Sequence, residues 1–284
     1  MRVGFELLDL ARAAGASSIF VVGTGRDVGK TTALRAIYDA ARGAGLSTAI
    51  ASLNPEHRLW LYPQTAFVTA RNALPSFPAA EILDFTRLQS PTGRLLYART
   101  ASSGRYELVG PPTASGVREI VAELSRFSEA VIVDGAVDRV AALAGSNGAI
   151  VVAAGAASAK TMQEAVDEVA ALVTRLSVPR ADPHAPAIEI QGALTSAQAV
   201  ALLAAGERRQ IVVRDPTQIA LSGNAATGAL GRLAVRCLRP LRVIAATVAS
   251  ISPERAFEPR AFARAVADST GLPTFDVYAG TRAA

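Results

Sequence analysis

One stretch of the sequence decides the fold, Gly23-Thr24-Gly25-Arg26-Asp27-Val28-Gly29-Lys30-Thr31-Thr32. A short apolar run precedes it at residues 18–22, and a helical pattern follows it over residues 30–42 and ends at Gly43 and Gly45. Glycines let the backbone approach a ligand closely, and the first amide groups of a helix carry partial positive charge. Strand, glycine-rich turn and helix together predict a loop that binds the phosphates of a nucleotide.

The side chains of this loop predict how the phosphates and a metal ion are held. We expect the Lys30 ammonium to reach the β- and γ-phosphates and the Thr31 hydroxyl to bind Mg²⁺. Arg26 has two interpretations, a contact to the γ-phosphate or to a partner subunit's nucleotide, or a solvated loop residue. The whole loop is predicted to bind the nucleotide: Gly23, Thr24, Gly25, Arg26, Asp27, Val28, Gly29, Lys30, Thr31 and Thr32.

Two acidic residues are further candidates for the magnesium site. Asp134 ends the apolar strand pattern at residues 130–133, where a carboxylate can bind Mg²⁺ directly or through water. The alternative is an ordinary Asp in a turn before Gly135. Glu56 follows the second strand pattern and can bind the metal or remain a loop carboxylate. We therefore predict Lys30 and Asp134 as the catalytic residues, and Thr31, Asp134 and Glu56 as metal ligands.

Apolar strand patterns alternate with helical patterns along the rest of the chain. This alternation predicts an α/β fold of the P-loop NTPase type, with a doubly wound, mostly parallel sheet and the ligand at the carboxyl ends of the strands. A hairpin is expected between residues 94–99 and 106–109, on either side of Gly104. The predicted strands lie at 18–22, 47–52, 66–70, 94–99, 106–109, 130–133, 149–153, 187–190, 210–213, 242–247 and 274–277, and the predicted helices at 5–14, 30–42, 114–127 and 158–176.

Length and proline content bear on the number of domains. We expect one domain over residues 1–284, because no low-complexity linker interrupts the chain. The proline-rich stretch 179–186 is a possible seam, which would separate a nucleotide-binding core, 1–178, from a C-terminal α/β part, 179–284.

Composition excludes several classes of function. Cys237 is the one cysteine and His57 and His184 are the two histidines, which argues against a disulfide, a Cys/His zinc site and a Ser-His-Asp triad. The net charge is +5, but the 27 Arg residues are scattered, and Lys30 and Lys160 are the sole lysines. We expect no nucleic-acid partner, no membrane partner and a cytoplasmic location.

The loop resembles that of dethiobiotin synthetases. It has five residues between Gly23 and Gly29 where the usual phosphate loop has four, and Asp27 matches an acidic position of that family. The resemblance assigns the phosphate lysine to Lys30 and the magnesium ligand to Thr31. Those enzymes carry a substrate-binding lysine just after the second strand, and the segment 51–56 has none. The resemblance therefore implies ATP and Mg²⁺ as ligands without that substrate pocket.

Six short phrases occur in order along the chain, at 23–32, 107–111, 133–139, 191–195, 212–217 and 275–277. Together they resemble the small subunit of lysine 5,6-aminomutase reactivases, a nucleotide-binding family that acts on an adenosylcobalamin enzyme. The resemblance implies a Mg²⁺- and ATP-dependent switch or helper for a partner protein, or a homodimer. The alternatives are a dethiobiotin-synthetase-like ligase acting on a small carboxylate or amine, and a nucleotide-binding module without turnover. Absence of the Asn-Lys-x-Asp guanine signature favours ATP over GTP.

Overall fold

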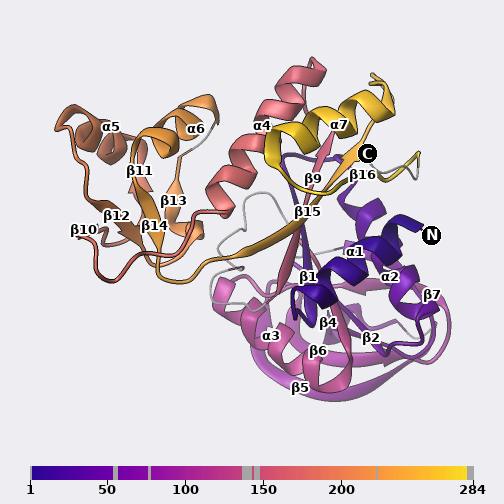
Figure 1. The fold of residues 1–284 in the computed structure, drawn as a ribbon. Helices are drawn as coiled ribbons and strands as arrows, with labels where there is room; N and C mark the ends of the chain where they lie inside the picture. The colour runs from indigo at the N-terminus through magenta and orange to yellow at the C-terminus, as the bar shows by residue number, and fades with distance from the viewer. Residues whose placement is uncertain are drawn as a thin grey trace. The chain divides into compact units, whose positions relative to one another are not determined.

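The protein has an α/β fold built around a large, mostly parallel sheet (Figure 1). The computed structural model describes residues 2–53, 57–75, 78–135, 143, 148–221 and 223–279, with the backbone alone for 223–227. The α-helices of these residues are α1 (Arg2–Ala13), α2 (Lys30–Gly43), α3 (Ala114–Phe127), α4 (Met162–Leu176), α5 (Ser196–Ala204), α6 (Gly223–Arg232) and α7 (Pro259–Thr270).

The largest sheet has nine strands in the order β16-β15-β9-β1-β8-β2-β4-β6-β5. Where pairings are described, β1, β8, β2 and β4 are parallel neighbours, β15 and β16 are parallel, and β6 and β5 add an antiparallel edge. Its strands are β1 (Ser18–Gly23), β2 (Thr48–Ser52), β4 (Thr65–Ala70), β5 (Ala80–Ser90), β6 (Gly93–Thr100), β8 (Ala130–Asp134), β9 (Ala149–Gly155), β15 (Arg242–Ala249) and β16 (Thr274–Asp276). The prediction of an α/β fold with a mostly parallel sheet is therefore confirmed.

The chain divides into two compact units that interleave in sequence. The first comprises Met1–Val22, Lys30–Ala142 and Asn147–Val151, and the second comprises Gly23–Gly29, Leu143–Ser146 and Val152–Ala284. Helices α1 to α3 belong to the first unit and helices α4 to α7 to the second. Residues 23–29 of the predicted phosphate loop are thus assigned to the second unit, whereas its residues 30–32 belong to the first, with all of α2 and most of β1.

Within the first unit, a glycine lets two helices approach closely. Gly4 of α1 is buried, and a Cβ atom there would overlap the carbonyl oxygen of Ala36 in α2. Buried Leu7 and Leu8 continue the α1 contact face, and Figure 1 shows α1 and α2 side by side. This packing fixes α2 from the side, and α2 is the helix that begins at Lys30.

The region between β2 and α3 differs from its sequence prediction. The expected hairpin of 94–99 with 106–109 does not form, because β6 is paired on both edges by β4 and β5. Instead, β7 (Gly104–Leu108) pairs antiparallel with β3 (His57–Leu61), a strand that the sequence analysis missed. The strand β5 was missed as well.

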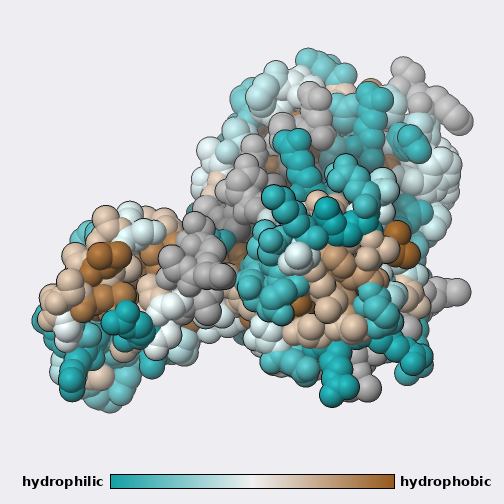
Figure 2. All heavy atoms as spheres, turned by 90° about the horizontal axis from the view of Figure 1, so that it is seen from above, coloured by the Kyte–Doolittle hydropathy of each residue, from teal (hydrophilic) through white to brown (hydrophobic). Residues whose placement is uncertain are grey.

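A small α/β element lies within the second unit. Parallel strands β10 (Ala187–Glu189), β12 (Gln210–Val213) and β14 (Val235–Cys237) form its sheet, and β11 (Leu194–Thr195) pairs with β13 (Ile219–Ala220). Helices α5 and α6 cover one face over a core that includes Ile211, Val213 and Val235. Figure 2 shows apolar residues at the surface over α5, the helix in which Val200 is 65 % exposed. No helix of the described residues is long and apolar enough to cross a membrane.

Candidate functional site

The predicted phosphate loop, residues 23–32, runs from the last residue of β1 into the first turn of α2. Helix α2 begins at Lys30, as predicted. Asp27 and Gly29 have left-handed backbone conformations, with φ of 54° and 83°. Asp is one of the few side chains that tolerate this conformation, and alternation of left- and right-handed residues can turn successive amide groups toward an anion. Arg26 and Asp27 are exposed, whereas Val28 and Gly29 are buried.

Glycines let the loop lie directly against neighbouring strands of the second unit. The Thr24 amide donates to the Ala153 carbonyl of β9 at 3.0 Å. A Cβ atom at Gly155 would lie 2.6 Å from the Cα of Val28, and one at Gly29 would lie 2.8 Å from the Cβ of Ala249. No room remains on this side of the loop, so its backbone is held in one path.

The segment after β9 supports the loop through polar contacts. Ser158 Oγ donates to the Gly155 carbonyl at 3.1 Å and lies 3.5 Å from Thr24 Oγ1. The Arg255 guanidinium donates to the carbonyl oxygens of Ala156 and Ala159. Sequence reasoning missed Gly155, Ser158 and Arg255 as parts of the site, since only their fold position brings them to the loop.

Helix α2 is anchored to β3 one turn after the predicted magnesium ligand. Lys30 is partly buried and Thr31 is exposed. The Arg35 guanidinium donates to the Trp60 carbonyl at 2.5 Å and to the Tyr62 hydroxyl at 3.1 Å, and it stacks over the Tyr62 ring at 5.0 Å. These contacts link the helix that carries Lys30 and Thr31 to the strand that begins at His57.

Asp134 lies at the carboxyl end of β8, between the ends of β1 and β2. It is in register with Val21 of β1 and with Ser52 of β2. Since α2 follows β1 closely along the chain, this edge of the first unit also receives the start of α2. Asp134 is 2 % exposed. The position at a strand tip agrees with the sequence prediction.

The structure shows a side-chain partner of the Asp134 carboxylate that the sequence did not predict. His57 Nδ1 donates to Asp134 Oδ2 at 2.6 Å. The hydrogen bond with Asp134 raises the pKa of His57, against the opposing effect of burial. The sequence held no signal for this pair, because the two residues lie on strands of different sheets and far apart in the chain.

The oxygen donors suit Mg²⁺ better than a softer metal. Thr31 offers a hydroxyl and Asp134 a carboxylate, and Mg²⁺ in nucleotide sites keeps waters and phosphates as its other ligands. In the described ranges, no group of three or more His, Cys, Asp or Glu side chains could hold a metal ion. Glu56, the third predicted metal ligand, lies outside the described residues.

Comparison with known proteins gives no relative for this chain: no family model, no curated protein and no solved structure matches it.

Proposed function

We propose that this protein binds ATP with Mg²⁺ through the loop Gly23–Thr32 and hydrolyses it slowly, as a switch for a partner enzyme. The observation that carries the proposal is local. A glycine-rich loop leads from a buried parallel strand into a helix at Lys30, and the adjacent strand ends in a buried carboxylate, Asp134. This is the arrangement that phosphate binding requires, with backbone amides, a helix N-terminus and one mobile ammonium.

Each residue has a separate role in the proposal. The loop amides and Lys30 bind the phosphates, and Thr31 and Asp134 bind the metal, Asp134 either directly or through water. Bound Mg²⁺ would neutralise charge on the β- and γ-phosphates. His57 orients the Asp134 carboxylate by donating to one of its oxygens, as outer partners of metal ligands commonly do.

Slow hydrolysis follows from what the site offers. Phosphoryl transfer needs positioning and charge stabilisation more than covalent chemistry, and the loop and helix supply both. In this proposal none of the described residues is assigned to activate the attacking water, and the hydrogen bond to Asp134 uses Nδ1 of His57. A partner protein, or a second copy of the chain, would complete the site, and such completion can raise rates by about 10³ to 10⁵.

The partner in this proposal is a cobalamin-dependent aminomutase, and it rests on the resemblance to reactivase small subunits alone. The competing proposal is a synthetase acting on a small carboxylate or amine. Phosphate release by the purified chain, measured alone, with the product of a neighbouring gene and with a panel of small acceptors, separates the two. Fast turnover with a small acceptor and no protein partner would favour the synthetase.

The nucleotide site itself is tested by a matched pair of lysine variants. Lys30→Ala should weaken binding of a fluorescent ATP analogue by about 100-fold or more, because charge-assisted contacts to phosphate are lost. Lys160→Ala removes the other lysine of the chain, an exposed residue, and should leave binding unchanged. Equal affinities for the two variants would refute the site.

The magnesium site is tested by the metal dependence of the same binding. Thr31→Val and Asp134→Asn should weaken binding in the presence of Mg²⁺ and change it little in EDTA, since each removes a ligand of the metal. Equal losses with and without Mg²⁺ would assign both residues to folding instead.

A further inference from the structure

The small α/β element of the second unit has a pocket of about 260 Å³ at the carboxyl ends of its parallel strands. Glu189 and Gln191 line it from β10 and the loop that follows, Val212 from β12 and Arg214 from just after β12, and Gln218 and Leu238 from the next turns. We propose that this pocket binds a small zwitterion of the α-amino acid class. The proposal does not rest on nucleotide binding.

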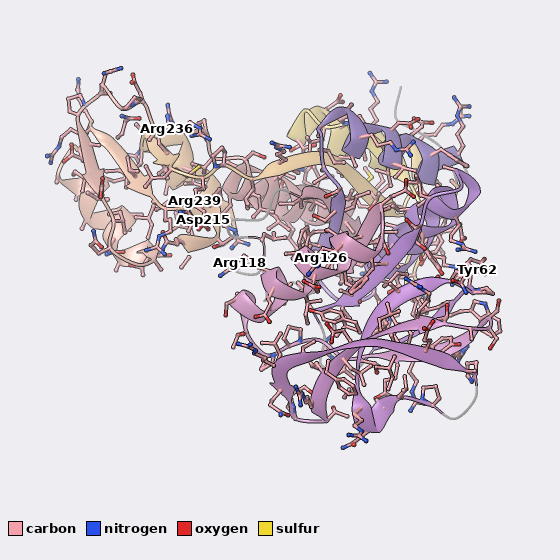
Figure 3. All side chains as sticks on the ribbon, turned by 90° about the horizontal axis from the view of Figure 1, so that it is seen from below. Tyr62, Arg118, Arg126, Asp215, Arg236 and Arg239 are labelled. Carbon is pink, nitrogen blue, oxygen red and sulfur yellow. The ribbon has the colours of Figure 1, made fainter. Side chains whose placement is uncertain are left out.

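Strand register explains why these side chains meet. Glu189 pairs with Val212, and side chains alternate between the two faces along a strand. Val212 therefore faces away from Ile211 and Val213, which join the core under α5 and α6. Figure 3, seen from the side opposite to that of Figure 2, shows the strands in front of the helices, with Asp215 and Arg239 just past the ends of β12 and β14. Ile190 and Val213, which pack toward the core, line the pocket as well, so the pocket lies at the ends of the strands.

One wall of the pocket is fixed by local hydrogen bonds. Asp215 is buried, and its carboxylate accepts from the amide of Thr217 at 3.0 Å. Gln218 Oε1 accepts from the Arg214 amide at 2.8 Å, which leaves the Gln218 side-chain nitrogen as a donor. A wall held in this way loses little conformational entropy when a ligand binds.

The charges of the pocket point to a ligand that carries both signs. Glu189 and Arg214 are exposed, and in the described part of the chain no ion pair joins either of them to another side chain. A guanidinium binds a carboxylate through two parallel hydrogen bonds, and a carboxylate binds an ammonium. Val212, which is buried, and Leu238, which is exposed, both line the pocket and offer apolar contact to an aliphatic side chain.

Size and position limit the ligand further. The volume lies just below the range of about 300–1,000 Å³ that is typical for drug-sized ligands, so a molecule of a few heavy atoms fits best. The crevice outside the carboxyl ends of parallel strands is the usual ligand site of α/β folds. The pocket overlaps two of the sequence segments given above, 191–195 and 212–217, to which the sequence analysis assigned no role.

Isothermal titration of the full chain with each standard L-α-amino acid tests the proposal. At least one should bind saturably at or below about 1 mM, and Glu189→Gln and Arg214→Gln should each weaken it by about tenfold or more. Arg208→Gln, an exposed arginine of the same element that does not line the pocket, is the matched control. The N-acetyl and the amide derivatives of the bound amino acid should both lose about tenfold.

A second measurement shows whether the amino acid binds in this pocket or elsewhere on the protein. Methyl NMR should show ligand-dependent shifts at Val212 and Leu238 in the parent, and the Arg214→Gln variant should need about tenfold more ligand or above to show them. No binding by any amino acid up to about 10 mM would overturn the proposal. So would binding that both pocket variants retain, or binding of N-acetyl derivatives as tight as that of the free amino acid, since Glu189 would then have no role.

Discussion

Replacing Gly155 by alanine should damage nucleotide binding, although Gly155 itself lies outside the loop that binds the nucleotide in our proposal. The added Cβ would lie 2.6 Å from Val28 Cα and 3.1 Å from Val28 Cβ, and an ordinary contact starts at 3.4 Å. The backbone at Val28 must therefore move by about 0.8 Å, and Val28 stands two residues before Lys30. A displacement of about 1 Å at a positioning group can cost about 100-fold in function.

Overpacking of this kind also costs about 1–3 kcal/mol of stability, so binding and stability are measured together. Titration with a fluorescent ATP analogue should show affinity lower by about tenfold to 100-fold, and urea unfolding should show the folded state retained at the binding temperature. Gly228→Ala serves as the control, because a Cβ there meets nothing within 4 Å. Parent-like ATP affinity in the folded Gly155→Ala variant would refute the argument that the close approach shapes a nucleotide loop.

Three further predictions concern stability and reactivity. Gly4→Ala should lower the free energy of unfolding, measured in urea, by about 1–3 kcal/mol, because the added Cβ makes α1 overlap α2. Gly228→Ala in α6 should instead raise it by up to about 1 kcal/mol, and equal effects of the two substitutions would contradict the packing described. The hydrogen bond to Asp134 raises the pKa of His57, so the stability that protonated His57 contributes is complete below its ordinary pKa of about 6.5 and is lost as pH rises through the raised value. The difference in unfolding free energy between the parent and His57→Asn, measured in urea, should therefore shrink from about pH 5 to about pH 9, and a constant difference would exclude the linkage. Cys237 is buried and its pKa is raised to about 11, so a thiol reagent near neutral pH should label it only as fast as the protein opens, and rapid labelling of the native protein would count against its burial.

The strands of the parallel sheet were predictable because they are continuously apolar. β1, β8 and β9 are buried along their whole length and lie within a residue or two of their predicted bounds. β5 escaped prediction because it lies at the end of the large sheet and exposes Glu81, Asp84 and Arg87 among its apolar residues. Two irregularities in its pairing with β6 also break the alternation that marks a strand.

The candidate site divides in the same way. The loop and Asp134 could be predicted, since each is a short contiguous pattern at the end of an apolar strand. The residues that contact the loop and Asp134 from elsewhere in the chain could not be predicted. His57 reaches Asp134 through the pairing of β3 with β7, a long-range contact that no local pattern encodes. Gly155 supports Val28 across an even larger separation in sequence.

The bridge between Arg180 and Cys237 bears on how this protein could have been assembled. The two residues are parallel neighbours, one just before β10 and the other at the end of β14, so the chain reaches the small α/β element and departs from it side by side and in the same direction. Joining the two ends would need a sideways step of roughly one strand spacing, about 4.8 Å. The intervening residues have their own apolar core. The element therefore has the geometry of an inserted module, one that a short direct connection between its two ends could replace.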